Sequence, residues 1–269
     1  MSTERFAREA GKYAAIAWLG ARRALSERAA VAGRALFLAV ILFIFGRVWA
    51  TVLGPGGRVG AAGRDELIFY LAVTEWCLLS VPPLYLSIEG DVRSGDVASQ
   101  MVRPISYLGA QLADALGETA LRMCVLGPTA ALVAWWIAGG WPADPRGLWL
   151  ALPLGLLAST LAVLSTAAIG VSAFWIVDTS PIYWIWQKLA FVLGGLMLPL
   201  ELYPDWLRAA ARFSPFPAML WGPGRMAFGF APGAALETLA ELVVWGTLAA
   251  LLLVWLARRA RTRIALAGG

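Results

Sequence analysis

Residues 148–177 read LWLALPLGLLASTLAVLSTAAIGVSAFWIV, a stretch without a single Asp, Glu, Lys or Arg. A helix needs about 20 apolar residues to cross the hydrocarbon core of a membrane, and this stretch exceeds that length. A helix of such length tilts across the bilayer or begins at the membrane surface before it enters. The stretch therefore predicts a membrane protein built from helices.

Five further stretches have the same apolar character. Gly/Pro-rich or charged segments separate them, and they cover residues 35–53, 67–88, 109–139, 181–202 and 233–257. The third of the six stretches is also longer than a simple span. We expect an all-α integral membrane fold with six transmembrane helices in one domain, residues 35–257.

The composition agrees with this class. Of the 269 residues, 60% are hydrophobic and 14% are charged, which is too apolar for a soluble domain. The chain has no histidine, which excludes Ser-His-Asp triads, His-ligated zinc or haem, and histidine proton relays. Cys77 and Cys124 fall inside apolar stretches, where we expect small buried side chains and no disulfide. No catalytic residue or metal ligand is expected on this chain.

The arginines and lysines indicate the orientation. If both termini are cytoplasmic, the cytoplasmic segments carry 14 Lys and Arg residues and the external segments carry 6. The positive-inside rule therefore favours a multi-pass protein of the cytoplasmic membrane with both ends in the cytoplasm. The basic residues flank the spans and form no separate domain, so the net charge of +5 indicates membrane orientation and not nucleic-acid binding.

Residues 1–34 mix apolar and basic positions before the first span. We expect an amphipathic helix at the cytoplasmic membrane surface, with apolar residues that include Phe6, Tyr13, Ile16 and Trp18. The alternative is a cleaved signal peptide, but charges interrupt the apolar region and no small-residue cleavage site follows. At the other end, residues 258–269 form a basic cytoplasmic tail.

Six of the ionisable residues inside the predicted spans are candidates for a polar group, because charge there is costly and faces protein or water. Asp114, Glu118 and Arg122 are four residues apart, so they share one helical face and can pair internally. Three charges on other spans are candidates to join this stripe across the bundle: Arg47, Glu75 and Lys188. The group forms either a clamp between helices, which we favour, or the polar lining of a pathway.

The segment before the last span has its own structure. A short amphipathic helix in residues 203–217 is ended by Ser214-Pro-Phe-Pro217, and we expect an external cap or a half-inserted hairpin. Before this segment, the pair Gly194-Gly195 and Pro199 indicate a close helix contact or a bend.

One internal loop is rich enough in charge to bind a partner. It reads EGDVRSGDVASQMVRP, residues 89–104, and lies between the second and third spans. Gly90 and Gly95 allow tight turns, and Arg103-Pro104 marks the return to the membrane. Charge-assisted contacts with a partner are expected from Glu89, Asp91, Arg93 and Asp96. The alternative is an ordinary solvated loop.

The order of these features resembles the permease subunit of ABC-2 type exporters, whose transmembrane domain is of the type V exporter kind. Three patterns carry the resemblance: Glu89 with Arg93-Ser94-Gly95 and Val102-Arg103-Pro104, then Leu198-Pro-Leu-Glu-Leu-Tyr-Pro204, and Phe213-Ser-Pro-Phe-Pro217. The resemblance covers nearly the whole chain. It is closest to the branch in which two different permeases accompany one ATPase.

The resemblance implies a dimer in which each permease rests on an ATP-binding subunit. The chain has no G-x-x-x-x-G-K-[ST] loop, so ATP and Mg are expected on the separate ATPase. Residues 89–104 then supply the coupling helix, with Glu89, Gly90, Asp91, Arg93, Ser94, Gly95, Asp96, Arg103 and Pro104 as the contact residues. The implied function is ATP-driven export of a hydrophobic or amphiphilic substrate by alternating access, together with a second copy or a different permease.

Three other interpretations remain open. An integral membrane enzyme, such as a lipid-linked transferase, needs clustered acidic residues or an activated nucleophile, and no D-x-x-D cluster is present. A second alternative is an importer permease. Importer permeases share a cytoplasmic Glu-Ala-Ala motif followed by Gly, and this chain lacks that motif. A membrane anchor or scaffold without transport is also compatible with the sequence.

Overall fold

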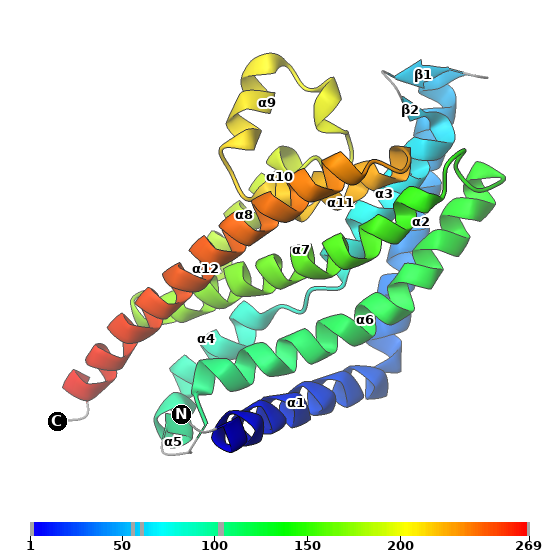
Figure 1. Ribbon diagram of the computed structural model, residues 1–269. Helices are drawn as coiled ribbons and strands as arrows, with labels where there is room; N and C mark the ends of the chain where they lie inside the picture. Colours follow the sequence, from blue (N-terminus) through cyan, green and yellow to red (C-terminus); the bar gives the residue numbers. More distant parts are fainter. Residues whose placement is uncertain (1–2, 55–56, 60–61, 102–104, 268–269) are drawn as a thin grey trace.

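Long tilted helices form the body of the protein in the computed structural model, which describes residues 3–54, 57–59, 62–101 and 105–267 (Figure 1). The long helices are α1 (Thr3–Ser26), α2 (Arg28–Leu53), α3 (Arg64–Leu79), α6 (Tyr107–Ala138), α7 (Arg146–Val171) and α12 (Pro232–Ala267). The shorter helices are α4 (Leu84–Ser94), α5 (Asp96–Met101), α8 (Ser180–Leu193), α9 (Asp205–Arg212), α10 (Phe216–Met219) and α11 (Trp221–Gly224). Three 3-10 turns complete the helical part: η1 (Ser172–Phe174), η2 (Leu200–Leu202) and η3 (Arg225–Phe228).

Five helical segments are long and apolar enough to cross a membrane. They are Arg28–Leu53, Arg64–Ser94, Tyr107–Ala138, Arg146–Phe174 and Pro232–Thr262. Each corresponds to one of the six stretches that the sequence predicts. The remaining stretch, 181–202, corresponds to α8, whose 14 residues extend only about 21 Å at 1.5 Å per residue. This is shorter than the hydrocarbon core of about 30 Å, so the count of six full-length spans is not confirmed.

Helix α3 is the centre of the bundle. Every side chain from Leu67 to Cys77 is buried, and the largest apolar cluster forms around this helix. Pro82 and Pro83 separate α3 from α4, because proline offers no backbone N–H and disfavours a helical residue before it. The second predicted span is therefore two helices joined by a short break.

The chain turns back into the bundle after α8. Gly195 adopts a positive φ of 69°, and its carbonyl accepts a hydrogen bond from the hydroxyl of Tyr70 on α3. The next carbonyl, of Leu196, accepts a hydrogen bond of 2.9 Å from Thr74. Helix α9 ends at Arg212, just before the Ser-Pro-Phe-Pro run, and α10 and α11 then pack among α3, α7 and α8, with Phe216 buried. The short helix expected in 203–217 is present as α9. The segment that follows it packs between the long helices.

Helix α1 lies along α6 and ends at Ser26, and α2 begins two residues later at Arg28 (Figure 1). The first span thus starts earlier than residue 35. Residues 258–267 continue helix α12.

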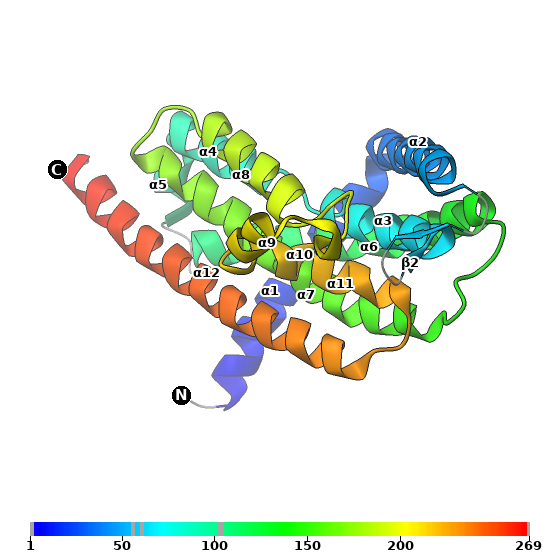
Figure 2. The same ribbon diagram turned by 90° about the horizontal axis from the view of Figure 1, so that it is seen from above.

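The two ends of the molecule differ in what they carry. The chain termini and α5 lie at one end, which we call the terminal end (Figure 1). Helix α9 and the small antiparallel pair of β1 (Arg58–Val59) with β2 (Ala62–Gly63) lie at the other, the hairpin end. Seen from above, α12 runs along one side of the molecule and α2 lies on the opposite side (Figure 2).

Candidate functional site

Helix α4 carries the charged segment that the sequence singles out, and it lies at the terminal end (Figure 1). Gly95 ends the helix with a φ of 80°, a left-handed conformation that glycine adopts without strain. The hydroxyl of Ser94 donates a hydrogen bond of 2.7 Å to Asp96 across this turn. Gly90, Ser94, Gly95 and Asp96 are exposed. Arg103 and Pro104 lie outside the described residues.

Glu89 faces the protein instead of the solvent. Its carboxylate is buried and accepts hydrogen bonds from the backbone N–H of Thr179, at 2.8 Å, and from the hydroxyl of the same residue. Arg93, one turn further along α4, forms an ion pair of 2.9 Å with Glu89. The guanidinium also donates a hydrogen bond of 2.7 Å to the carbonyl of Val177. Helix α4 is therefore fastened to the segment that leads into α8.

Asp91 fastens the same helix to α6. Its carboxylate accepts hydrogen bonds of 2.7 Å from the hydroxyl of Tyr107 and 2.7 Å from the side-chain amide of Gln111. The sequence places Glu89 and Asp91 among the residues that contact a partner. In the structure both carboxylates are engaged by groups of this chain.

A charged residue in the loop before α8 shares this electrostatic environment. The backbone N–H of Ser180 donates a hydrogen bond of 2.9 Å to Asp178. This bond, with a smaller contribution from the charge of Arg93, lowers the pKa of Asp178. The loop before α8 is thus held by Asp178 internally and by Glu89 and Arg93 from α4.

The polar stripe on α6 pairs as its spacing predicts, and α1 completes it. Glu118 forms an ion pair with Arg122 one turn away. Arg23 from α1 lies 2.5 Å from Asp114 and 3.3 Å from Glu118. The hydrogen bond from Arg23 to Asp114 raises the pKa of Arg23. Two carboxylates and two guanidinium groups thus join α1 to α6.

Close backbone packing brings these charges together. A side chain at Gly117 would overlap the carbonyl of Ala17, and one at Gly20 would overlap the carbonyl of Asp114. Small residues allow the two helix backbones to approach in this way. The arrangement supports the clamp between helices that we favour from the sequence.

The other predicted members of the polar group are placed differently. Arg47 is exposed on α2, and Lys188 is exposed on α8, where it lies over the rings of Trp184 and Phe191 at 5.9 and 5.3 Å. Both residues are exposed, and among the described residues neither forms an ion pair with the stripe. Glu75 is buried on α3.

Arg122 is the most enclosed charge of the stripe. Its side chain is only 5% exposed, and among the described residues its Nε and one terminal nitrogen have no hydrogen-bond partner. Nearby, Arg34 of α2 donates a hydrogen bond of 2.8 Å to the carbonyl of Leu79. Because buried charge without full pairing is costly, the packing of α1 and α6 must hold this group in place.

Sequence reasoning missed four residues that complete these links: Arg23, Tyr107, Gln111 and Thr179. The sequence gives a hint for Arg23, because a basic residue of the N-terminal segment needs an acidic partner where this segment packs against the bundle. Thr179 has none, because its role depends on the distance between α4 and α8 in the folded chain.

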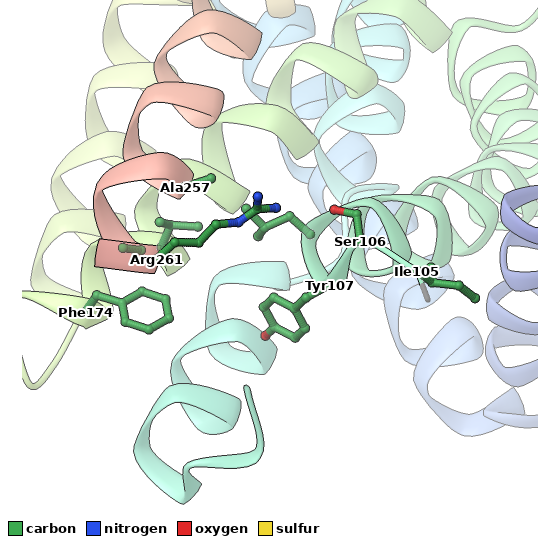
Figure 3. A pocket seen from close by; sticks show the side chains of 9 residues that line it. Ile105, Ser106, Tyr107, Phe174, Ala257 and Arg261 are labelled. Atoms are coloured by element: carbon green, nitrogen blue, oxygen red, sulfur yellow. The ribbon is translucent and has the colours of Figure 1, made fainter. Parts of the chain in front are cut away.

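Several cavities lie within the described part of the chain, and three of them have volumes of about 350 Å³ or more. The largest, about 630 Å³, is lined by apolar residues of α3, α6 and α7, among them Trp76, Met123 and Trp149. A second of about 380 Å³ lies between α7, α8, α10 and α12. The third, about 350 Å³, lies at the terminal end between α6, α7 and α12 (Figure 3).

The cysteines are both free. Cys77 is buried as expected, whereas Cys124 is exposed on the outer face of α6 and lines the largest cavity. The expectation of a buried side chain is wrong for Cys124, because its side chain lies at the open cavity and not in the packed core. Within the described ranges, no group of three or more Cys, Asp or Glu side chains is placed to hold a metal ion.

Comparison with known families gives one match. The profile of a family described as an ABC-2 family transporter protein matches residues 65–262, which is most of the chain and includes α4, the stripe and all three cavities. A comparison with individual curated proteins finds no match.

Proposed function

The chain belongs to the ABC-2 transporter family, and from this premise we propose that it is the permease subunit of an ATP-driven exporter. In this proposal a separate ATPase subunit binds ATP and Mg. The permease carries the substrate across the cytoplasmic membrane by alternating access. The observation that carries the proposal is the fastening of α4 to two other membrane elements at once.

The proposed topology has six crossings. Helix α8 starts at the terminal end, and the segment from Gly194 to Phe228 packs into the bundle beyond its other end. Together they form the crossing that is missing from the five long spans, which is the fifth along the chain. With six crossings, both termini lie on one side, which agrees with their common end in Figure 1. The positive-inside rule makes this side the cytoplasm. The hairpin end is then external, and α1 lies near the cytoplasmic surface.

Coupling follows from the contacts of α4. A partner that binds the exposed tip at Ser94, Gly95 and Asp96 would push on a helix that cannot move alone. Asp91 would carry the motion to α6 through Tyr107 and Gln111. Glu89 and Arg93 would carry it to α8 through Thr179 and Val177. Closure of the ATPase would therefore move both helices as rigid bodies.

The cargo and the assembly are further parts of the proposal. The two larger cavities are lined almost wholly by apolar groups, which suits a hydrophobic or amphiphilic substrate. The exposed apolar face of α2, with Leu36 and Val52 more than 60% exposed, suits contact with lipid or with a second permease. We propose a dimer of permeases, formed by a second copy or by a different subunit.

The test is co-expression with a candidate ABC ATPase subunit from the same genome, purification through a tag on this chain, and measurement of vanadate-sensitive ATP hydrolysis in lipid. We expect a stable, active complex. Asp96→Arg reverses an exposed charge at the tip of α4 and is expected to release the ATPase. Asp205→Arg, at a position with 99% side-chain exposure on α9 at the opposite end, is the matched control and is expected to leave the complex intact. If both variants retain the ATPase equally, the proposal that α4 is the docking element is refuted.

A further inference from the structure

The cavity at the terminal end differs from the other two because it combines charge with apolar surface. It has a volume of about 350 Å³ and opens between the start of α6, the end of α7 and the last turns of α12 (Figure 3). Arg261 is the charged side chain in its lining. The lining shares one residue with the contacts of α4, because Tyr107 also donates a hydrogen bond to Asp91.

Arg261 points into the cavity. Figure 3 shows its guanidinium group extending from α12 towards Ser106, at the start of α6. Within the described part of the chain, Arg261 has neither an ion pair nor a hydrogen bond. Its five N–H donors are therefore available to an acceptor in the cavity.

The opposite wall also favours an anion. Helix α6 begins here with Ser106 as the N-cap, and its first turn contains no acidic residue. A helix of this length carries a partial positive charge at its N-terminus. Asp91 is the nearby acid, but it is outside the lining and is engaged by Tyr107 and Gln111. Arg261 and the helix end are thus the positive groups at the cavity wall.

The apolar part of the lining suits a lipid. Leu108, Val171 and Phe174 contribute apolar surface to it. On α12, Arg259 lies 5.5 Å over the ring of Trp255, one turn from the cavity. Tryptophan and arginine together are typical of the boundary between the hydrocarbon and the headgroups. A cavity at this boundary would be level with the lipid phosphates.

We propose that this cavity binds the phosphate group of an anionic membrane lipid, with the guanidinium of Arg261 as the main ligand and the acyl chains along the apolar part of the lining. Basic pockets between transmembrane helices on the cytoplasmic side bind such headgroups in general. The proposal rests on the membrane topology given above and is independent of ATP coupling. The same phosphate chemistry is offered by soluble phosphate, which the experiment distinguishes.

The experiment measures lipid binding to the full-length chain by native mass spectrometry in neutral detergent. Phosphatidylglycerol is compared with phosphatidylcholine, and neutral micelles remove the general attraction of a charged membrane surface. Arg261→Gln is expected to weaken phosphatidylglycerol binding about tenfold, as the loss of a charge-assisted hydrogen bond predicts. Arg258→Gln removes the same charge from the same helix outside the cavity and is expected to have no effect. Ala257→Phe fills the cavity, keeps the charge and is expected to displace the lipid.

Three results would overturn the proposal: equal binding of the two lipids, equal losses in the two arginine variants, or unchanged binding in Ala257→Phe. Displacement of phosphatidylglycerol by millimolar inorganic phosphate would assign the site to soluble phosphate and overturn the lipid assignment. The assay uses the permease alone. Loss of ATPase association in the co-purification experiment therefore leaves the lipid result unaffected.

Discussion

The link between α4 and α8 predicts the outcome of a single substitution, Thr179→Val. Valine keeps the shape of threonine and removes one hydrogen bond to the buried carboxylate of Glu89. Two partners of the carboxylate remain, the backbone N–H at 2.8 Å and Arg93 at 2.9 Å. Hydrogen bonds to charged groups contribute about 1.5–3 kcal/mol, and we expect a loss near the lower end because Glu89 is not left unpaired.

The assay is the apparent melting temperature in detergent, for which a loss of about 1.5 kcal/mol corresponds to a decrease of about 3–6 °C. Thr247→Val is the matched control, because this exposed hydroxyl donates only to Val243 within its own helix. We expect the control to change stability by less than about 0.5 kcal/mol. A double-mutant cycle with Glu89→Gln is expected to be non-additive by about 1 kcal/mol. Equal melting temperatures for the two valine variants, or strict additivity in the cycle, would refute the link.

Three further predictions concern other contacts. Gly117→Ala is expected to separate α1 from α6 because its Cβ would overlap the carbonyl of Ala17, and hydrogen exchange in α1 should increase; Gly11→Ala, where nothing lies within 4 Å, is expected to leave exchange unchanged or slower. Glu118→Gln leaves Arg122 buried without its charge partner and should cost about 3–5 kcal/mol of stability, whereas Glu237→Gln, at a position with a 62% exposed side chain, should cost less than about 1 kcal/mol; equal melting temperatures would contradict this. The hydrogen bonds from Arg146 and from the N–H of Phe230 lower the pKa of Asp144, so this carboxylate stabilises the fold above the ordinary aspartate pKa of about 4 and loses that effect as the pH falls further; Asp144→Asn should abolish the acid dependence of exchange at Phe230, and persistence of that dependence would exclude Asp144 as its origin.

The sequence predicts the membrane class and five of the long helices, because apolar length is a local property of the chain. It does not predict the length of the helix in 181–202, where the apolar run continues although α8 ends at Leu193. The end is determined by contacts distant in sequence, since Tyr70 and Thr74 bind the carbonyls of Gly195 and Leu196 in place of a continuing helix. Hydropathy does not register such contacts.

In the candidate site, too, local contacts can be predicted from the sequence and contacts between distant segments cannot. The pairing of Glu118 with Arg122 follows from their spacing on one helix, and the structure confirms it. Partners on other helices do not follow from spacing. Arg23 takes the place that Lys188 and Arg47 were expected to fill, because α1 packs on α6 through glycines. In the same way, Glu89 is a charged residue in a polar segment and is expected at the surface. In the structure its carboxylate binds Thr179, a residue distant in sequence that folding brings near.

The most direct test of the account is a site-specific crosslink in the ATP-hydrolysing complex. A photo-crosslinking amino acid is placed at Ser94, at the exposed tip of α4, or at Trp206, which is 72% exposed on α9 at the opposite end. The account predicts a covalent adduct with the ATPase subunit from position 94 and none from position 206. An adduct from position 206, or no adduct from position 94 in an active complex, would contradict it.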